Sequence, residues 1–359
     1  MQNGPPDAPP KQRRGATFNP ANRYHETETV ALDDGWDNLA EAPETLPTSL
    51  SVDASRSILS RNDSPDIPFD RSINPYRGCE HGCIYCYARP SHAWLGLSPG
   101  LDFESRLFYK PDAAKILRRE LGRRGYAPSP LALGANTDAY QPAERRLAIT
   151  RAILEVLAET RHPVTIITKS ALVERDQDLL TCMAGDRLAT VHVSLTTLDA
   201  GLARTLEPRA ASPLRRLRAI AALANAGIPV GVMLAPVIPG LTDAHMERIL
   251  SAARDAGATF AGYTLLRLPG EVSSLFRDWL SHHHPEKAAR VMGILRDTRN
   301  GEDNDARSGR RMVGRGPLAE MLGRRFTLAC KRLGYGSPPV LACNRFRPPT
   351  ATRAQMDLF

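Results

Sequence analysis

Short apolar runs alternate with amphipathic stretches along most of the chain from about residue 72. The apolar runs have the length of buried strands. A first strand lies in the stretch 73–88, and the others cover residues 131–135, 164–168, 189–195, 229–235 and 260–266. Apolar positions at helical spacing predict helices over residues 111–123, 143–160, 176–183, 213–226 and 243–256. Repeated strand–helix units of this kind are typical of a parallel sheet covered by helices.

Six such units predict an α/β fold, a partial (βα)6 TIM-like barrel whose function lies at the carboxyl ends of the strands. The stretch 220–241 is uncharged over 22 residues, which is the length of a membrane span. Gly227, Pro229, Pro236 and Pro239 interrupt this stretch. We therefore interpret it as a helix end, a turn and a buried strand, and we expect no membrane association.

Composition divides the chain into four parts. Residues 1–63 are rich in Pro, Asn, Asp, Ser and Thr without sustained periodicity, which predicts a partly disordered extension. The barrel is expected over residues 64–280, followed by a basic extension over 281–354 and a short tail over 355–359. A chain of 359 residues is long enough for this arrangement.

The net charge of +8 is local rather than general. Residues 286–359 hold 15 Lys or Arg against 7 Asp or Glu, whereas the preceding 285 residues hold 32 of each sign. A basic segment on a neutral body favours a polyanionic partner such as nucleic acid, with a solvated charged face as the alternative. Only six cysteines in the chain exclude a disulfide scaffold.

Three of those cysteines, Cys79, Cys83 and Cys86, follow the first strand at C-x3-C-x2-C spacing. Three thiolates on one loop can wrap a soft metal centre, and a 4Fe-4S cluster held by three cysteines keeps one iron open for chemistry. The alternative is a structural zinc site with His81 or His92 as the fourth ligand. Zinc sites of that kind usually contain paired C-x2-C units, and no second pair occurs in the sequence.

The cysteine spacing, the aromatic Tyr85 before the last cysteine and the strand–helix order resemble the radical S-adenosylmethionine superfamily. The resemblance covers about residues 72–269. It implies that the three cysteines bind a 4Fe-4S cluster and that the open iron binds S-adenosylmethionine. Reductive cleavage of that cofactor would yield a 5′-deoxyadenosyl radical, which abstracts hydrogen from a substrate.

Three further stretches resemble the spore photoproduct lyase-like branch, which is related to DNA repair photolyases: residues 134–144, 206–209 and 235–240. This resemblance implies that Asn136 and Thr137 lie near the methionine part of the cofactor. It also implies that Lys169 pairs with the cofactor's carboxylate and that Ser194 contacts its ribose or carboxylate. We complete the expected cofactor-binding set with Tyr85 and two strand-end carboxylates, Asp138 and Glu144, although Asp138 as a helix cap and Lys169 as a solvated residue are the alternatives.

The sequence departs from that branch in one respect. Spore photoproduct lyases have a hydrogen-donating cysteine near the end of the second strand, where this chain has Gly134, Ala135 and Asn136. The absence of that thiol argues against transferring their substrate. Tyr140 is a possible substitute donor, although an aromatic residue at this place more often packs.

The last five residues include Gln355, Leu358 and Phe359 in the order Gln-x-x-Leu-Phe, which resembles the bacterial sliding-clamp-binding peptide. In such peptides the Gln side chain makes polar contacts while Leu and Phe fill an apolar pocket. The alternative is an apolar chain end that folds onto its own core.

These features together predict a cytoplasmic radical S-adenosylmethionine enzyme that repairs or modifies DNA or another nucleic acid. A reductant protein such as flavodoxin or ferredoxin would supply its electrons. Two alternatives remain open on the sequence: a radical enzyme acting on a peptide or small molecule, and a non-catalytic, metal-stabilised nucleic-acid or clamp adaptor.

Overall fold

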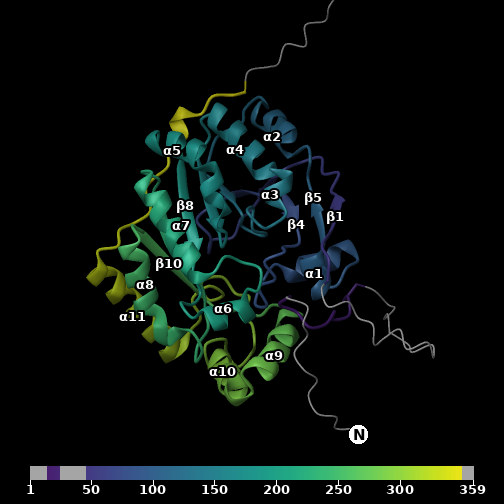
Figure 1. Ribbon diagram of the computed structural model, residues 1–359, viewed down its shortest axis with the longest axis vertical. Coiled ribbons are helices and arrows are strands. Elements are labelled where there is room, and N and C mark those ends of the chain that lie inside the picture. Colours follow the sequence, from purple (N-terminus) through teal and green to yellow (C-terminus); the bar gives the residue numbers. More distant parts are fainter. Residues whose placement is uncertain (1–13, 25–45, 350–359) are drawn as a thin grey trace, which may run out of the picture.

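The computed structural model describes residues 14–24 and 46–349, which form a curved sheet with helices on its outer face (Figure 1). Seven strands make up the main sheet in the order β10-β9-β8-β7-β6-β3-β2. Their bounds are β2 (Leu59–Arg61), β3 (Arg71–Ile73), β6 (Leu131–Leu133), β7 (Val164–Thr168), β8 (Ala189–Ser194), β9 (Val230–Val237) and β10 (Phe260–Leu265). The six strands from β3 to β10 are parallel, and only β2 is antiparallel. The predicted partial (βα)6 barrel is therefore confirmed.

The helices that follow the strands are amphipathic, and the longer of them bury an apolar stripe against the sheet. They are α2 (Ala113–Leu121), α3 (Glu144–Leu147), α4 (Ile149–Glu159), α5 (Gln177–Gly185), α6 (Ala200–Leu206), α7 (Pro213–Asn225) and α8 (Met246–Asp255). Helix α7 shows how the sequence sets the bounds: the Ser212 hydroxyl caps the Arg215 N–H at 3.3 Å, and Gly227 takes a positive φ of 75° just after the helix.

One predicted helix is in fact two. The stretch 143–160 breaks at Ala148, which has a φ of 50° between α3 and α4. The physical reason is the buried Glu144 carboxylate, which accepts hydrogen bonds from the Thr150 N–H at 3.0 Å and the Arg151 N–H at 3.4 Å. These donors belong to the first turn of α4, so Glu144 satisfies groups that would otherwise have no partner.

The pattern of apolar residues did not predict several elements of the structure. A second sheet has the order β1-β5-β4, with β1 (Ser49–Val52), β5 (Arg106–Tyr109) and β4 (Tyr76–Arg77). The short helices missed are η1 (Arg89–Leu95) and α1 (Leu101–Ser105), with the 3-10 turns η2 (Ala171–Asp176) and η4 (Cys343–Arg345), and two longer helices were also missed, α9 (Val272–His283) and α10 (Pro285–Asp297). The helix predicted over 243–256 begins as the 3-10 turn η3 (Asp243–His245) and continues as α8. Strands of two to four residues are too short to show a sustained alternation.

The described parts of the N-terminal region are built into the folded unit. Strand β2 pairs with β3 in the main sheet, β1 pairs with β5, and Ile58 is 1% exposed in the core. Residues 14–24 lie against the body through hydrogen bonds such as Ser98 Oγ to the Pro20 carbonyl at 2.7 Å. The expected boundary at residue 63 therefore does not divide the described part of the fold.

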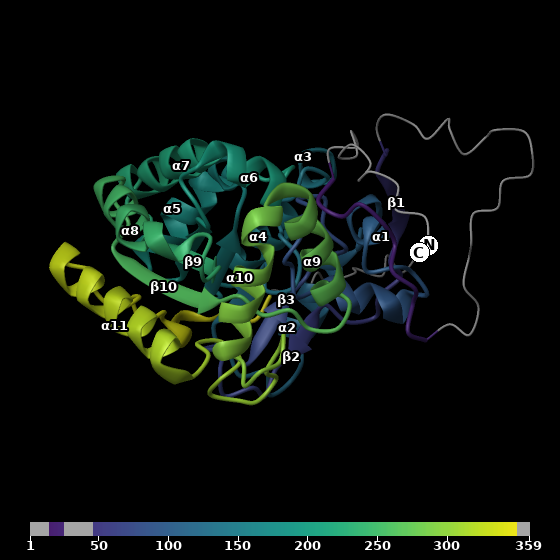
Figure 2. The same ribbon diagram turned by 90° about the horizontal axis from the view of Figure 1, so that it is seen from below.

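The C-terminal region lies at the amino ends of several strands, and its helix α11 lies next to the edge strand β10 (Figure 2). Gly336 forms a bridge to Phe260 at the start of β10. The Ala342 N–H donates to the Arg187 carbonyl at 2.9 Å before β8, and the Arg347 N–H donates to the Thr160 carbonyl at 2.8 Å before β7. Helix α11 (Gly316–Leu333) packs beside α8. Much of the predicted basic extension is thus an integral part of the barrel.

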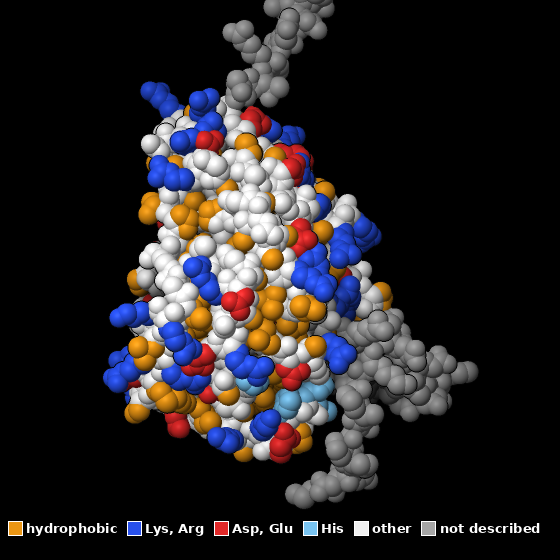
Figure 3. Space-filling view, turned by 60° about the vertical axis from the view of Figure 1, so that its left-hand side comes forward, with side chains coloured by type: hydrophobic (Ala, Val, Ile, Leu, Met, Phe, Trp, Pro, Cys, Tyr) orange, Lys and Arg blue, Asp and Glu red, His pale blue; other side chains and the backbone are white. Residues whose placement is uncertain are grey.

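Many arginines of this region have structural partners. Ion pairs join Arg296 to Asp303, Arg307 to Asp305, Arg311 to Asp66, Arg325 to Glu247 and Arg345 to Asp186. The buried Arg299 bonds to carbonyl oxygens, including that of Leu266 at 2.7 Å. On the face that Figure 3 shows, Lys and Arg side chains are dispersed among Asp and Glu rather than gathered into one patch. Fewer positive charges of this region are therefore available to bind a polyanion than its net charge suggests.

The uncharged stretch 220–241 divides into the end of α7, a turn at Gly227 and strand β9, as predicted. No helix in the described part of the chain is long and apolar enough to cross a membrane.

Candidate active site

The cysteine loop follows β3 at the carboxyl ends of the parallel strands. Cys79 and Cys83 are buried, Cys86 is partly exposed, and all three are free thiols. The loop is curled by backbone hydrogen bonds: the Gly82 N–H donates to the Cys79 carbonyl at 3.3 Å, and the Cys86 N–H donates to the Cys83 carbonyl at 3.1 Å. The structure therefore places the three thiols on one compact, buried loop.

The residues of the loop suit a soft metal cluster. Gly78 and Gly82 have φ of 76° and 66°, and a Cβ on Gly78 would lie 2.5 Å from Leu107 Cδ2. Burial raises the pKa of the Cys83 thiol to about 12, although the Lys169 ammonium opposes this rise. Buried thiols of this kind become thiolates when a soft cation binds, and iron is such a cation.

The two histidines of the zinc alternative have partners other than the cysteines. The His81 ring faces Asp138, with Nδ1 3.3 Å from the carboxylate. The His92 ring bonds to the Arg106 carbonyl at 2.9 Å and meets Phe103 edge to face. Within residues 14–24 and 46–349, no three or more His, Cys, Asp or Glu side chains converge on a site for a single metal ion. Neither histidine is placed as a fourth zinc ligand.

A segment near the N-terminus covers the cysteine loop. The Gly15 and Ala16 N–H groups both donate to the buried Glu104 carboxylate at 2.8 Å, and Glu104 also pairs with the buried Arg89. Arg89 in turn donates to the Cys83 carbonyl at 3.0 Å. The covering segment is thus tied through Glu104 and Arg89 to the backbone of the loop itself.

Gly15 is the point of closest approach between the covering segment and the loop. A Cβ there would lie 1.8 Å from the Gly82 carbonyl oxygen, a backbone atom that cannot move aside without shifting the loop. We expect Gly15→Ala to destabilise the protein by about 1–3 kcal/mol and to speed the bleaching in air of an iron–sulfur cluster reconstituted on the loop. Urea unfolding and the loss of cluster absorbance measure the two effects.

The matched control for this prediction is Gly293→Ala. Gly293 lies in α10, where a Cβ would point into open space with nothing within 4 Å, so this change should preserve or slightly raise stability. Equal behaviour of the two variants would contradict the close contact at Gly15.

Beneath the loop lies a buried polar network centred on Glu207. Its carboxylate accepts hydrogen bonds from the Tyr85 hydroxyl and from Thr196 Oγ1, the latter at 2.8 Å. It also forms an ion pair with Arg216 in which both side chains are 1% exposed. Burial would raise the pKa of Glu207, but Arg216 and Lys169 hold it at about 2, so the carboxylate is ionised.

Lys169 lies between this network and the cysteines. Its ammonium is 5.8 Å from the centre of the Tyr85 ring. Burial would lower the pKa of Lys169, but Cys83 and Glu207 raise it, so the side chain remains a cation at the mouth of the barrel. Ser194, 3% exposed at the end of β8, is joined to the same network because its carbonyl accepts from Arg216 Nη1 at 3.1 Å.

Asp138 holds the strand ends together. Its carboxylate accepts from Thr168 Oγ1 at 2.8 Å, from the Lys169 N–H at 2.7 Å and from the Tyr140 N–H at 2.9 Å. Burial would raise the pKa of Asp138, but His81 and these donors hold it at about 2. The carboxylate is occupied by these contacts, which favours a role in positioning Lys169 over direct cofactor binding.

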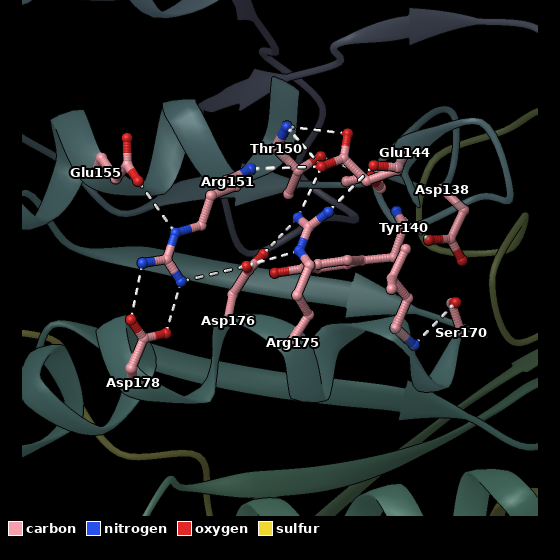
Figure 4. A network of polar contacts seen from close by, with 12 residues as sticks. Asp138, Tyr140, Glu144, Thr150, Arg151, Glu155, Ser170, Arg175, Asp176 and Asp178 are labelled. Carbon is pink, nitrogen blue, oxygen red and sulfur yellow. Dashed lines mark hydrogen bonds and ion pairs between the residues drawn. The ribbon is translucent and has the colours of Figure 1, made fainter. Parts of the chain in front are cut away.

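Glu144 lies in a separate network, with Arg175 and Asp176 (Figure 4). It is fully buried, it accepts from the Thr150 N–H at the α3–α4 break, and it also bonds to Tyr76 and Arg175 in the protein interior. The expected cofactor role of Glu144 is therefore corrected to a structural one. Tyr140 is also fully buried, with Arg175 over its ring at 5.9 Å, so it packs in the core and is no substitute hydrogen donor.

The remaining two predicted residues follow β6. Thr137 is 3% exposed and donates to the Tyr76 carbonyl at 3.0 Å, so its hydroxyl is already engaged. Asn136 is exposed, and its N–H donates to Asn74 Oδ1 at 2.9 Å, which leaves its side chain at the mouth. The structure thus gathers the cysteines, Tyr85, Lys169 and Ser194, with Asn136 at the rim.

Sequence reasoning missed the residues that support this site. Glu207 and Arg216 are far from the cysteines in sequence, although Glu207 lies in one of the stretches that carried the family resemblance. Glu104 and Arg89 are charged residues within short, irregular elements. No local pattern distinguishes such buried ion pairs from surface charges.

Comparisons with known proteins agree with this geometry. Residues 73–253 match the family described as the Radical SAM superfamily. An uncharacterized protein of Mycobacterium tuberculosis (strain ATCC 25618 / H37Rv) is 40% identical over 64% of this chain and 68% of its own length. An uncharacterized protein of Methanocaldococcus jannaschii is 28% identical over 60% of this chain and 76% of its own length.

Solved structures of spore photoproduct lyase have a similar fold. The complex with dinucleoside spore photoproduct superposes with a TM-score of 0.57 at 16% identity, over 81% of each chain. A variant with bound AdoMet and dinucleoside spore photoproduct gives 0.56 over the same shares. At this level of identity the likeness concerns the fold alone.

Proposed function

The chain belongs to the radical SAM superfamily, whose enzymes use a 4Fe-4S cluster and S-adenosylmethionine, and we propose that Cys79, Cys83 and Cys86 hold that cluster for radical chemistry on nucleic acid. One observation carries the proposal: three free thiols lie on one buried loop at the carboxyl ends of the parallel strands. This is the end of a barrel at which side chains from several strands can meet one ligand.

When bound, the cluster supplies the electron that cleaves S-adenosylmethionine and so provides a 5′-deoxyadenosyl radical for hydrogen abstraction. The chain's own part is to bind and orient the cofactor. We assign Lys169 to its carboxylate, because a partly buried ammonium whose pKa is raised by Cys83 and Glu207 is a strong partner for that group. Ser194 and Asn136 offer hydrogen bonds, and Tyr85 offers its ring beside Lys169.

The network around Glu207 would keep this arrangement rigid and dry. Glu207 balances the charges of Arg216 and Lys169, and its hydrogen bond fixes the Tyr85 ring. The covering segment at Gly15 and Ala16 would limit access of water and oxygen to the cysteine loop from outside. Free thiols and a cluster of this kind favour a reducing cytoplasm, with a flavodoxin or ferredoxin as electron donor.

Nucleic acid is the substrate class that we favour. Spore photoproduct lyase, with a similar fold, is described in complex with dinucleoside spore photoproduct. The lesion itself does not carry over, because Gly134, Ala135 and Asn136 stand where those enzymes have a hydrogen-donating cysteine, and the buried Tyr140 cannot replace it. We therefore propose DNA repair or modification with a different target in the nucleic acid.

Isotope transfer tests this proposal. The anaerobic, reduced enzyme is incubated with S-adenosylmethionine and fully deuterated DNA, with undeuterated DNA as the control. We expect deuterium in the 5′-deoxyadenosine product from the labelled DNA only. Cofactor cleavage without deuterium transfer from DNA or RNA would contradict a nucleic-acid substrate and favour the alternative of a peptide or small molecule. The non-catalytic adaptor is not retained, because membership in this family makes the chain an enzyme.

The tail over residues 355–359 lies outside the described residues, and we propose from its sequence that it binds a bacterial sliding clamp. Phe359→Ala should weaken binding of the full chain to purified clamp by at least about tenfold, because the ring would fill the apolar pocket. Met356→Ala, at an unspecified position of the motif, is the control and should bind normally. Equal binding by both variants would refute the assignment.

A further inference from the structure

Arg267 lies at the mouth of the barrel, two residues beyond the end of β10. Its guanidinium carbon is 4.2 Å from the centre of the Tyr87 ring. Tyr87 directly follows Cys86, and its hydroxyl donates to the Ala135 carbonyl beyond the end of β6. The Tyr87 ring thus reaches from the β6 side of the mouth to the β10 side, where it supports the guanidinium.

The Arg267 guanidinium has no charged or hydrogen-bonding partner among the described residues. No residue within the described ranges forms a hydrogen bond or an ion pair with its side chain, although the side chain is partly buried. The neighbouring arginines differ: Arg311 pairs with Asp66 at 2.6 Å, and Arg299 is bonded to the carbonyls of β10 and the following loop. Because the guanidinium is only partly buried, its five donors can meet solvent or a ligand.

We propose that Arg267 is an anion-binding residue of the substrate site and that it binds a phosphate group of the nucleic-acid substrate. This proposal rests on the proposed function. It adds that the enzyme recognises a phosphate group of the substrate close to the cysteine loop. A planar guanidinium matches two oxygens of a phosphodiester at once. The Asp66 carboxylate is already paired with Arg311, so the excess charge at this side of the mouth is positive.

Tyr87 is a positioning residue in this proposal. The ring supports one face of the guanidinium and so holds the donors of Arg267 in one orientation. Lysine could supply the charge but neither the stacking nor the fork. Tyr87→Phe should preserve the support, and Tyr87→Leu should remove it.

The test measures binding of two probes to the anaerobically reconstituted enzyme. One probe is single-stranded dT10, and the other is its methylphosphonate counterpart, which keeps the bases but lacks the backbone charge. We expect Arg267→Gln to weaken dT10 binding by about 10-fold to 100-fold and to leave methylphosphonate binding unchanged. The dependence of dT10 affinity on salt should also become shallower by about one phosphate contact.

The control variant is Arg290→Gln, which removes the same charge from an exposed position of α10. Its dT10 affinity should fall by less than about twofold. Arg267→Lys should recover little of the lost affinity, and Tyr87→Leu should lose affinity where Tyr87→Phe does not. Melting curves establish that each variant is folded before binding is compared.

The outcomes separate this inference from the proposed function. Strong dT10 binding that Arg267→Gln leaves unchanged, or lowers no more than Arg290→Gln does, overturns the role of Arg267 while nucleic acid remains the substrate. Equal loss for dT10 and the methylphosphonate probe also overturns it, since the effect would not depend on phosphate. If the unaltered enzyme binds neither probe, both the inference and the nucleic-acid substrate are wrong.

Discussion

Cys83→Ala should abolish formation of 5′-deoxyadenosine, reducing it to the background without enzyme. Cys83 lies at the centre of the loop between Cys79 and Cys86, and two thiolates cannot hold three irons of a cluster. The purified variant should therefore retain much less iron than the unaltered protein, which should hold about four irons per chain. Anaerobic iron analysis and chromatography of the cleavage products measure both effects.

Cys182→Ala is the matched control for this change. Cys182 is an exposed free thiol in α5, on the outer face of the barrel, so its loss should leave the iron content and the cleavage rate unchanged. If Cys83→Ala retained full cleavage activity, the cysteine loop would not be the cluster site.

Glu207→Ala should produce the largest loss of stability, about 3–5 kcal/mol in the free energy of unfolding. The change removes the partner of a buried ion pair and leaves the Arg216 and Lys169 cations without compensation. It also leaves the Tyr85 hydroxyl without its acceptor at Glu207. Urea unfolding under anaerobic conditions gives the change directly.

Two further variants provide losses of stability with which that of Glu207→Ala can be compared. Glu207→Gln keeps an acceptor for Tyr85 and should lose less stability. Glu174→Ala breaks an exposed pair with Arg215 and should cost about 1 kcal/mol or less. A Glu207→Ala protein no less stable than the Glu174→Ala protein would show that the network around Glu207 does not support the site.

Five of the six parallel strands could be predicted, because buried parallel strands are apolar on both faces. The first strand, β3 (Arg71–Ile73), overlaps the expected stretch 73–88 only at Ile73. The bounds of β7 agree with the prediction, and those of β6, β8, β9 and β10 differ by one or two residues. The second sheet and η1 could not be predicted, because their residues are held by contacts with distant segments and carry no periodicity.

Only those site residues that form a short motif in the sequence could be predicted. The spacing of the three cysteines is such a signal, and the structure places all three on one loop. Glu144 shows the limit, since a carboxylate at a strand end can point to the mouth or, as here, cap the next helix. Arg267 is the opposite case, a residue at the mouth of the barrel that the sequence did not indicate. Nothing in the neighbouring sequence shows that Arg267 stacks on Tyr87.

We expect this barrel to perform radical chemistry from a cluster on its cysteine loop. The most direct measurement is product formation by the unaltered protein, reconstituted with iron and sulfide without oxygen and given S-adenosylmethionine and a strong reductant. The account predicts a brown protein that converts S-adenosylmethionine into 5′-deoxyadenosine and methionine. A colourless zinc protein, or a brown protein that forms no 5′-deoxyadenosine under these conditions, would contradict it.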